Sequence, residues 1–171
     1  MAAKSRKRSN TGQSRKDAIA LLKEDHKNVK GLLQRLEKTT EDDTEERDEL
    51  LAEVETEITV HTQIEEEIFY PAFKDAIRQE SQARLYFEAL EEHHVVDLVM
   101  PEIKSTDTAS EKFAAKAKVL KDLIEHHAEQ EETEMFPKAR KTLGAARLRE
   151  LGQELADRKS ELMADMESDA A

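Results

Sequence analysis

The chain has 171 residues, which is long enough for one domain with a core of its own. Charged residues make up 39% and aromatic residues 4%, with only four Gly and three Pro, so the composition favours an all-α fold and excludes an all-β sandwich or barrel. The absence of cysteine excludes disulfides and thiolate chemistry, and leaves nitrogen and oxygen as the ligands for any metal. A net charge of −12 argues against nucleic-acid binding by the folded part. Neither a membrane helix nor a secretory signal is evident, so we expect a cytoplasmic protein.

Charge is distributed unevenly along the chain. The first 16 residues hold six Lys or Arg and no acid, mixed with Ser, Asn and Gly, which is typical of a disordered segment. We therefore expect a disordered basic arm at 1–14, a folded bundle at 15–142, and a C-terminal helix and tail at 143–171. The arm is interpreted as a solvated tail, and its binding to nucleic acid, an acidic protein or another protomer is the alternative.

The first expected helix runs from about residue 15 to residue 38. Its apolar side chains recur at alternating steps of three and four, which places them on one helix face. Ser14 and Asp17 are a candidate N-cap pair. The line on this face consists of Ile19, Leu22, His26, Val29, Leu33 and Leu36.

A second helix is predicted after the acidic break at 39–43, where Asp43 and Glu46 form a capping signal. Pro71 is predicted to kink or end this helix near Tyr70, because proline lacks the N–H that a helix interior needs. The second line consists of Leu51, Val54, Ile58, His61, Glu65, Ile68 and Ala72.

Two more helices are predicted on either side of a loop at 105–110, the first beginning near Ser81 and containing Pro101 near its end. Four such helices joined by short loops indicate an up-down-up-down four-helix bundle. The third line is Tyr86, Ala89, His93, Val96, Met100 and Ile103, and the fourth is Phe113, Ala117, Leu120, Ile124, His127 and Glu131.

A fifth helix is expected from about residue 145 to residue 163. Its leucines fall on one side, so we expect it to pack outside the bundle or against a partner, and an oligomer could form through it. These leucines are Leu148, Leu151, Leu155 and Leu162.

Each of the four bundle lines contains one histidine where an apolar residue belongs. The intervals between these histidines are nearly equal, each about one passage to a bundle end and back, so the four side chains can meet in one layer. Two lines also contain a Glu, and an unpaired ionised Glu in such a seam would cost several kcal/mol. A bound metal pair would supply the missing positive charge.

An internal repeat supports this interpretation. Residues 61–71 match residues 127–137, since each block has Glu four positions after His and Pro ten positions after it. Positions i and i+4 are neighbours on a helix face, so His and Glu can reach the same metal site. The duplication suits two metals with two bridging carboxylates. The candidate metal ligands are His26, His61, Glu65, His93, His127 and Glu131.

Two assignments within this set have alternatives. His94 also lies on an apolar phase of its helix, but the match to the first helix favours His93. Moving the fourth line to His126 would place Lys and Gln on the seam, so His127 is favoured. Tyr70 and Tyr86 are expected near the layer, where apolar packing explains each better than metal binding.

This pattern resembles the hemerythrin-like, HHE cation-binding family. The residues that carry the resemblance are Glu24-Asp25-His26, the two His-x-x-x-Glu blocks that end in Pro, and the segment 91–94, all in order between about residues 17 and 140. The resemblance implies a four-helix bundle around two non-heme iron ions with an oxo or hydroxo bridge. It also implies that the protein handles oxygen species or senses iron or oxygen.

Two departures from the oxygen-carrying hemerythrins argue against reversible oxygen carriage. The carriers have another His one turn after the third-helix ligand, whereas here Asp97 follows His93 and Leu98 follows His94 at that spacing. They also place the last carboxylate five residues after its His, which would be Glu132. Peroxide decomposition, nitric-oxide chemistry, and iron or redox sensing are therefore the expected roles, with peroxide or diatomic molecules as ligands.

Three other interpretations fit less well. A ferritin-like carboxylate bundle needs Glu-x-x-His twice, and only Glu91 and His94 have that spacing. Zinc usually takes four ligands, fewer than this layer offers. A metal-free bundle with neutral, hydrogen-bonded histidines would explain one such residue better than four.

Overall fold

The structure is a computed structural model that describes residues 16–78 and 80–169, so the predicted basic arm and Ser14 lie outside the described residues. All regular structure in these ranges is helical. The elements are α1 (Ala18–Glu37), α2 (Thr44–Ile64), η1 (Glu65–Phe69), α3 (Tyr70–Ala76), α4 (Glu80–Lys104), α5 (Glu111–Gln130), η2 (Glu131–Met135) and α6 (Phe136–Asp169).

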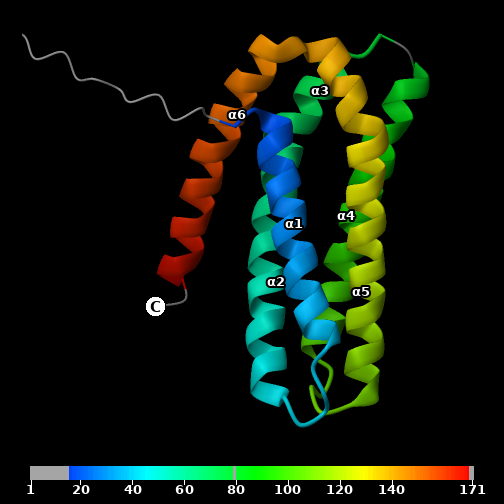
Figure 1. The fold of residues 1–171 in the computed structure, drawn as a ribbon, viewed down its shortest axis with the longest axis vertical. Coiled ribbons are helices and arrows are strands. Elements are labelled where there is room, and N and C mark those ends of the chain that lie inside the picture. The colour runs from blue at the N-terminus through cyan, green and yellow to red at the C-terminus, as the bar shows by residue number, and fades with distance from the viewer. Residues whose placement is uncertain (1–15, 79, 170–171) are drawn as a thin grey trace, which may run out of the picture.

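The helices α1, α2, α4 and α5 form the predicted up-down-up-down bundle (Figure 1). α1 packs against α2 and α5, and α4 packs against α5 and α2. The loops 38–43 and 105–110 lie together at one end of the bundle, which we call the loop end, and α3 lies at the other end. The all-α prediction is confirmed.

Side chains at the helix starts explain where the helices begin. The carboxylate of Asp17 and the hydroxyl of Ser110 each accept a hydrogen bond from a backbone N–H three residues later, at 2.8 and 3.1 Å. Asp43 stands at the cap position of α2 but makes no such bond. Its carboxylate instead accepts from the N–H and hydroxyl of Thr40, so the capping box predicted with Glu46 is wrong.

Two apolar clusters lie on opposite sides of the histidine layer. The loop-end cluster contains Val29, Leu33 and Phe113, and is closed by the buried guanidinium of Arg47. This guanidinium donates to the backbone oxygens of residues 39 and 108, one in each loop, at 3.2 and 2.5 Å. Arg47 therefore joins the two loops.

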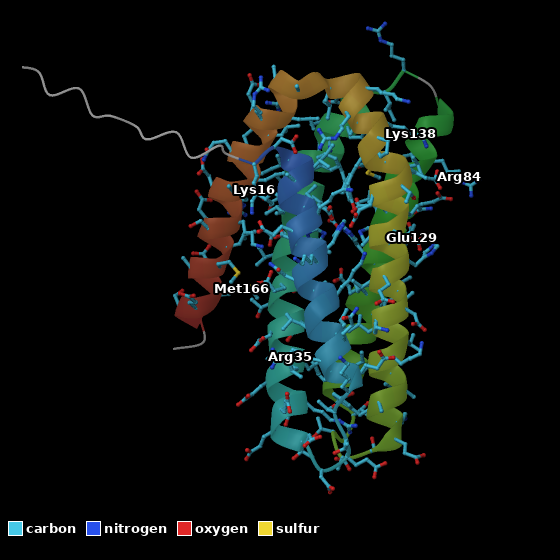
Figure 2. All side chains as sticks on the ribbon, in the orientation of Figure 1. Lys16, Arg35, Arg84, Glu129, Lys138 and Met166 are labelled. Atoms are coloured by element: carbon cyan, nitrogen blue, oxygen red, sulfur yellow. The ribbon has the colours of Figure 1, made fainter. Side chains whose placement is uncertain are left out.

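The last helix crosses the far end of the bundle and returns along α1 and α2 (Figure 1). The reversal occurs at Gly144, whose φ of 74° is strained for any residue with a Cβ. Met166 also packs against the adjoining cluster, and Figure 2 shows where it lies on α6. Packing of this helix outside the bundle is confirmed, and an oligomer formed through it stays a prediction. The leucines buried by this packing are Leu148, Leu151, Leu155 and Leu162.

Candidate metal centre

Two π turns, η1 and η2, form the ends of the two sequence repeats. Each begins at the repeat's Glu, Glu65 or Glu131, and the helix continues beyond the following proline. The N–H of the residue before the proline bonds to the carbonyl five positions earlier, which is the carbonyl of that Glu. The helix therefore does not end at Pro71 near Tyr70 but continues to Ala76. Single π turns inside α-helices are frequent at functional sites.

The π turn inserts one residue and thereby rotates the helix face that follows. Ile68 and Ala72, predicted on the buried line, are only partly buried, whereas Phe69 and Phe73 are fully buried. The second repeat shows the same offset. There the buried residues after Glu131 are Met135, Phe136 and Ala139.

All six predicted site residues meet in one buried layer, with exposed fractions between 0 and 6%. Their ligand atoms form two groups, and Glu65 belongs to both, as expected of a carboxylate that bridges two metal ions. The second carboxylate, of Glu131, approaches His26 Nε2 at 3.1 Å and His127 Nε2 at 3.6 Å. The first group is His26, His61, Glu65 and Glu131, and the second is Glu65, His93 and His127.

Several buried polar atoms of the layer lack hydrogen-bond partners in the protein. Both ring nitrogens of His61, and one atom each of His26, Glu65 and Glu131, are buried without a hydrogen-bond partner. The Nε2 atoms of His93 and His127 approach each other at 3.2 Å. Unpaired buried polar atoms are costly, and hydrogen bonds within the protein leave these atoms of the layer unsatisfied. The donor set fits cations, and its members' role as ligands stays a prediction.

A ring of outer carboxylates, not predicted from the sequence, surrounds the histidines. Each histidine has a carboxylate from a neighbouring segment near its Nδ1 atom. For His26, His93 and His127 the distance is that of a hydrogen bond, and since a carboxylate only accepts, Nδ1 of these three carries the proton and Nε2 faces the centre. The outer acids adjoin site residues in the sequence, a signal that could have identified them. The pairs are Glu132 with His26 at 3.0 Å, Asp25 with His61 at 3.6 Å, Glu66 with His93 at 2.8 Å, and Glu92 with His127 at 2.8 Å.

α6 supports one member of this ring. The ammonium of Lys159 donates to Asp25 Oδ1 at 2.7 Å and lies 3.4 Å from Glu57. Burial works in the opposite direction, but the nearby His61 imidazole and the hydrogen bond from Lys159 lower the pKa of Asp25. The C-terminal helix therefore helps to keep a buried carboxylate ionised beside the centre.

The hydroxyl of Tyr70 lies inside the layer, where the sequence favoured packing. It donates to Glu131 Oε1 at 2.9 Å and lies 3.3 Å from Glu65 Oε2 and 3.2 Å from His93 Nε2. Burial, followed by the two carboxylates, raises the pKa of Tyr70 well above its ordinary value, so the hydroxyl keeps its proton. Tyr86 is partly buried and packs edge-to-face on Tyr70.

Without a metal, the charges within the layer are unequally shared. Burial and the neighbouring Glu131 raise the pKa of Glu65 well above its usual range. Burial opposes ionisation of Glu131 as well, but His127, His26 and His61 hold its pKa at about 2. Burial lowers the pKa of His61 to about 4. The two carboxyl groups thus share one proton.

The competing histidines and carboxylates point away from the layer. His94 and Asp97 are exposed, and the His126 side chain is 70% exposed. Glu132 binds the outer side of His26, whereas Glu131 lies inside. The position of Glu91 and His94 also excludes the ferritin-like interpretation, because both residues are exposed and lie outside the layer.

Comparison with known proteins agrees with this geometry. The model of the Hemerythrin HHE cation binding domain family matches residues 17–139, which is most of the chain. The chain belongs to the hemerythrin HHE family. Membership and the buried His/Glu groups together support cation binding by this hemerythrin-family protein.

Two relatives illustrate the range of this similarity. A Hemerythrin HHE cation binding domain-containing protein from Mycobacterium kansasii has 28% identity and a TM-score of 0.76, and the match covers 88% of this chain and 89% of that one. A DNA nickase from Nostoc sp. is 23% identical over 142 residues, or 83% of this chain. The hemerythrin-family chain spans 39% of the length of that nickase.

Proposed function

We propose that this protein holds two non-heme iron ions between its four histidines and two buried glutamates, and reacts with hydrogen peroxide or nitric oxide rather than storing oxygen reversibly. The observation that carries the proposal is the division of the ligand atoms into two groups that share Glu65. A zinc site of four ligands would use only part of this set. Iron, when bound, would supply electron exchange with the small ligand.

A small cavity beside the layer supports the choice of ligand. It has a volume of about 20 Å³, room for about one molecule of the size of water. The four histidines line one side, and Val29, Ile58, Val96 and Ile124 line the loop-end side. Glu65 and Glu131 are not among the lining residues, so the ligand would approach from the side opposite the carboxylates. The apolar wall would exclude bulk water from a bound ligand.

The chain's own residues have separate roles in this proposal. Glu132, Glu66 and Glu92 fix the orientations of His26, His93 and His127, because each accepts a hydrogen bond from Nδ1–H and thereby aims Nε2 inward. Tyr70 keeps a proton at Oη, 2.9 Å from Glu131, which it can donate as charge develops in the layer. Exposed Asp97 does not replace the histidine that the oxygen carriers have at that position.

A cytoplasmic location is part of the proposal; within the described ranges, no helix is long and apolar enough to cross a membrane.

DNA nicking, for which the Nostoc relative is named, is not proposed for this chain. Apart from the six bases of the first 16 residues, 21 Lys and Arg stand against 39 Asp and Glu, a balance that would repel a phosphate backbone.

The test combines metal analysis with peroxide turnover. Protein reconstituted anaerobically with ferrous iron should retain about two ions per chain, as two ligand groups require. On oxidation it should absorb in the near ultraviolet and evolve oxygen from peroxide. His61→Ala and Glu65→Ala should lose iron and activity, whereas the matched surface variant His126→Ala should retain both.

Retention of less than one ion would contradict the dinuclear site. Turnover no faster than that of free iron, together with reversible oxygen binding by the reduced protein, would favour the carrier function. Preferential loading with zinc would overturn the assignment of iron.

A further inference from the structure

The two sides of the bundle that flank the histidine layer differ in how they are covered. α6 packs along α1 and α2, whereas the opposite side, formed by α4 and α5, carries an open groove of about 880 Å³. Apolar side chains are exposed there, including Phe87 at 55% and Val95 at 39%. Figure 2 shows Arg84 on this side of the molecule, away from the returning part of α6 that carries Met166.

The outer groove and the inner cavity share two lining residues, Glu92 and Leu123. These two side chains, one from α4 and one from α5, therefore form the partition between solvent and the cavity beside the histidines. Both are only partly buried, whereas Val29 and Ile58 on the α1 and α2 side of the cavity are 2 and 5% exposed.

The two residues of the partition are held differently. Glu92 accepts a hydrogen bond from His127 Nδ1 at 2.8 Å and lies 3.7 Å from His126 Nε2, so its carboxylate is anchored. Leu123 precedes His127 by one helical turn and has no polar anchor, so rotation about its side-chain bonds can open a path. Rotamer changes of such partly exposed side chains occur within nanoseconds.

The rim of the groove adds a charge preference. Glu88, Glu91 and Glu92 line it. Arg84 pairs with Glu88 at 2.5 Å and Glu92 contacts His126 and His127, whereas no basic side chain of the described residues pairs with Glu91. Because like charges repel across a low-dielectric rim, the groove should slow anions more than neutral molecules.

We propose that small uncharged ligands enter from the α4–α5 groove and pass between Leu123 and Glu92 into the cavity, with Leu123 as the gate. This inference rests on the proposed iron site only because the experiment detects a ligand when it binds to the iron. It assigns the access route and a preference for neutral molecules such as nitric oxide over anions such as azide.

The experiment measures ligand binding to iron-loaded protein by stopped-flow absorbance, with nitric oxide and azide as probes. Leu123→Ala should raise the association and dissociation rate constants of both by about tenfold, equivalent to ~1.4 kcal/mol of barrier. Leu123→Phe should lower both rate constants, and in each case their ratio, the affinity, should change less than twofold. Leu32→Ala, which truncates a partly buried leucine outside the cavity lining, should change neither rate constant.

Charge selection is tested by Glu91→Gln, because Glu91 lines the rim and, unlike Glu92, does not hold His127. Azide association should accelerate about fivefold relative to nitric oxide, as expected for one charge removed at a focused site. Added salt should reduce this difference, because ions screen the rim charges.

Rate constants that do not respond to either Leu123 variant would overturn the gate. Slowing by Thr62→Leu, at the other partly buried position of the lining, would also overturn it and would place the route between α2 and α4. These outcomes require bound iron and a binding spectrum in the wild type; their absence would contradict the proposed function instead.

Discussion

Replacing Glu65 by Gln should stabilise the metal-free protein and weaken its hold on metal. Glu65 is fully buried, and both burial and the charge of Glu131 raise its pKa well above the ordinary 4.5. The folded metal-free protein therefore holds this proton to a higher pH than the unfolded chain does. Gln has the same shape and never requires that proton.

The magnitude follows from proton linkage. Below pH 4.5 the carboxyl is protonated in both states, so Glu65→Gln should change little. As pH rises above 4.5, the wild type loses about 1.4 kcal/mol of stability per pH unit relative to the variant, until the folded pKa is reached. The difference stops growing at the pH where folded Glu65 releases its proton, and each kcal/mol corresponds to roughly 2–4 °C in melting temperature for a domain of this size.

The assay is urea or thermal unfolding of chelator-treated protein, followed by circular dichroism between about pH 5 and pH 8. Glu131→Gln is the matched contrast, because its pKa of about 2 shows a carboxylate stabilised by His127, His26 and His61. That contribution is present above pH 4.5 and is lost as the pH falls toward 2, so this variant should be less stable at neutral pH.

Metal should reverse the order for Glu65. An ion displaces the proton and binds the native state, which adds about 4 kcal/mol at a free concentration 1,000 times the dissociation constant. Loaded wild type should then melt above loaded Glu65→Gln. Equal stabilities of the two metal-free proteins at every pH would refute the shared proton, and melting curves unchanged by chelator would refute a core metal site.

Three further outcomes are expected from other parts of the fold. Lys159→Met should leave Asp25 unsupported and weaken metal affinity about tenfold, measured by chelator competition. Gly152→Ala should destabilise the protein by about 1–3 kcal/mol in urea unfolding, because a Cβ would lie 2.5 Å from the backbone before α1, whereas Gly31→Ala, with open space, should stabilise it by about 1 kcal/mol. Arg47→Met should cost about 2–4 kcal/mol and leave the iron content unchanged, because its hydrogen bonds to both loops lie far from the site.

The sequence was sufficient for the bundle and for the layer because both depend on helical periodicity. Steps of three and four placed His26, His93 and His127 on buried faces, and their neighbours His94 and His126 are exposed as favoured. Periodicity assumes an unbroken helix, however. The prediction therefore failed beyond Glu65, where the inserted residue of η1 turns Phe69 inward in place of Ile68.

The outer carboxylates escaped the sequence analysis for a different reason. Each lies next to a site residue in the chain, as Asp25 precedes His26, but serves a histidine on another segment. Periodicity describes one helix at a time and cannot show which neighbour a polar edge residue faces. The hydroxyl of Tyr70 was missed similarly, because its position depends on the rotation that the π turn introduces.

The carboxylate pairs follow the bundle around its circumference. The acid of α1 supports the histidine of α2, η1 supports α4, α4 supports α5, and η2 supports α1. No helix orients its own histidine, so the inward aim of each ring depends on the placement of a neighbouring segment. If cations bind these two groups of rings, they need every pair in register, so metal binding and bundle packing would stabilise each other. The pairing also explains why the two repeats share their spacing from His through Glu to Pro: each π turn positions both the buried Glu of the layer and the outer carboxylate beside it.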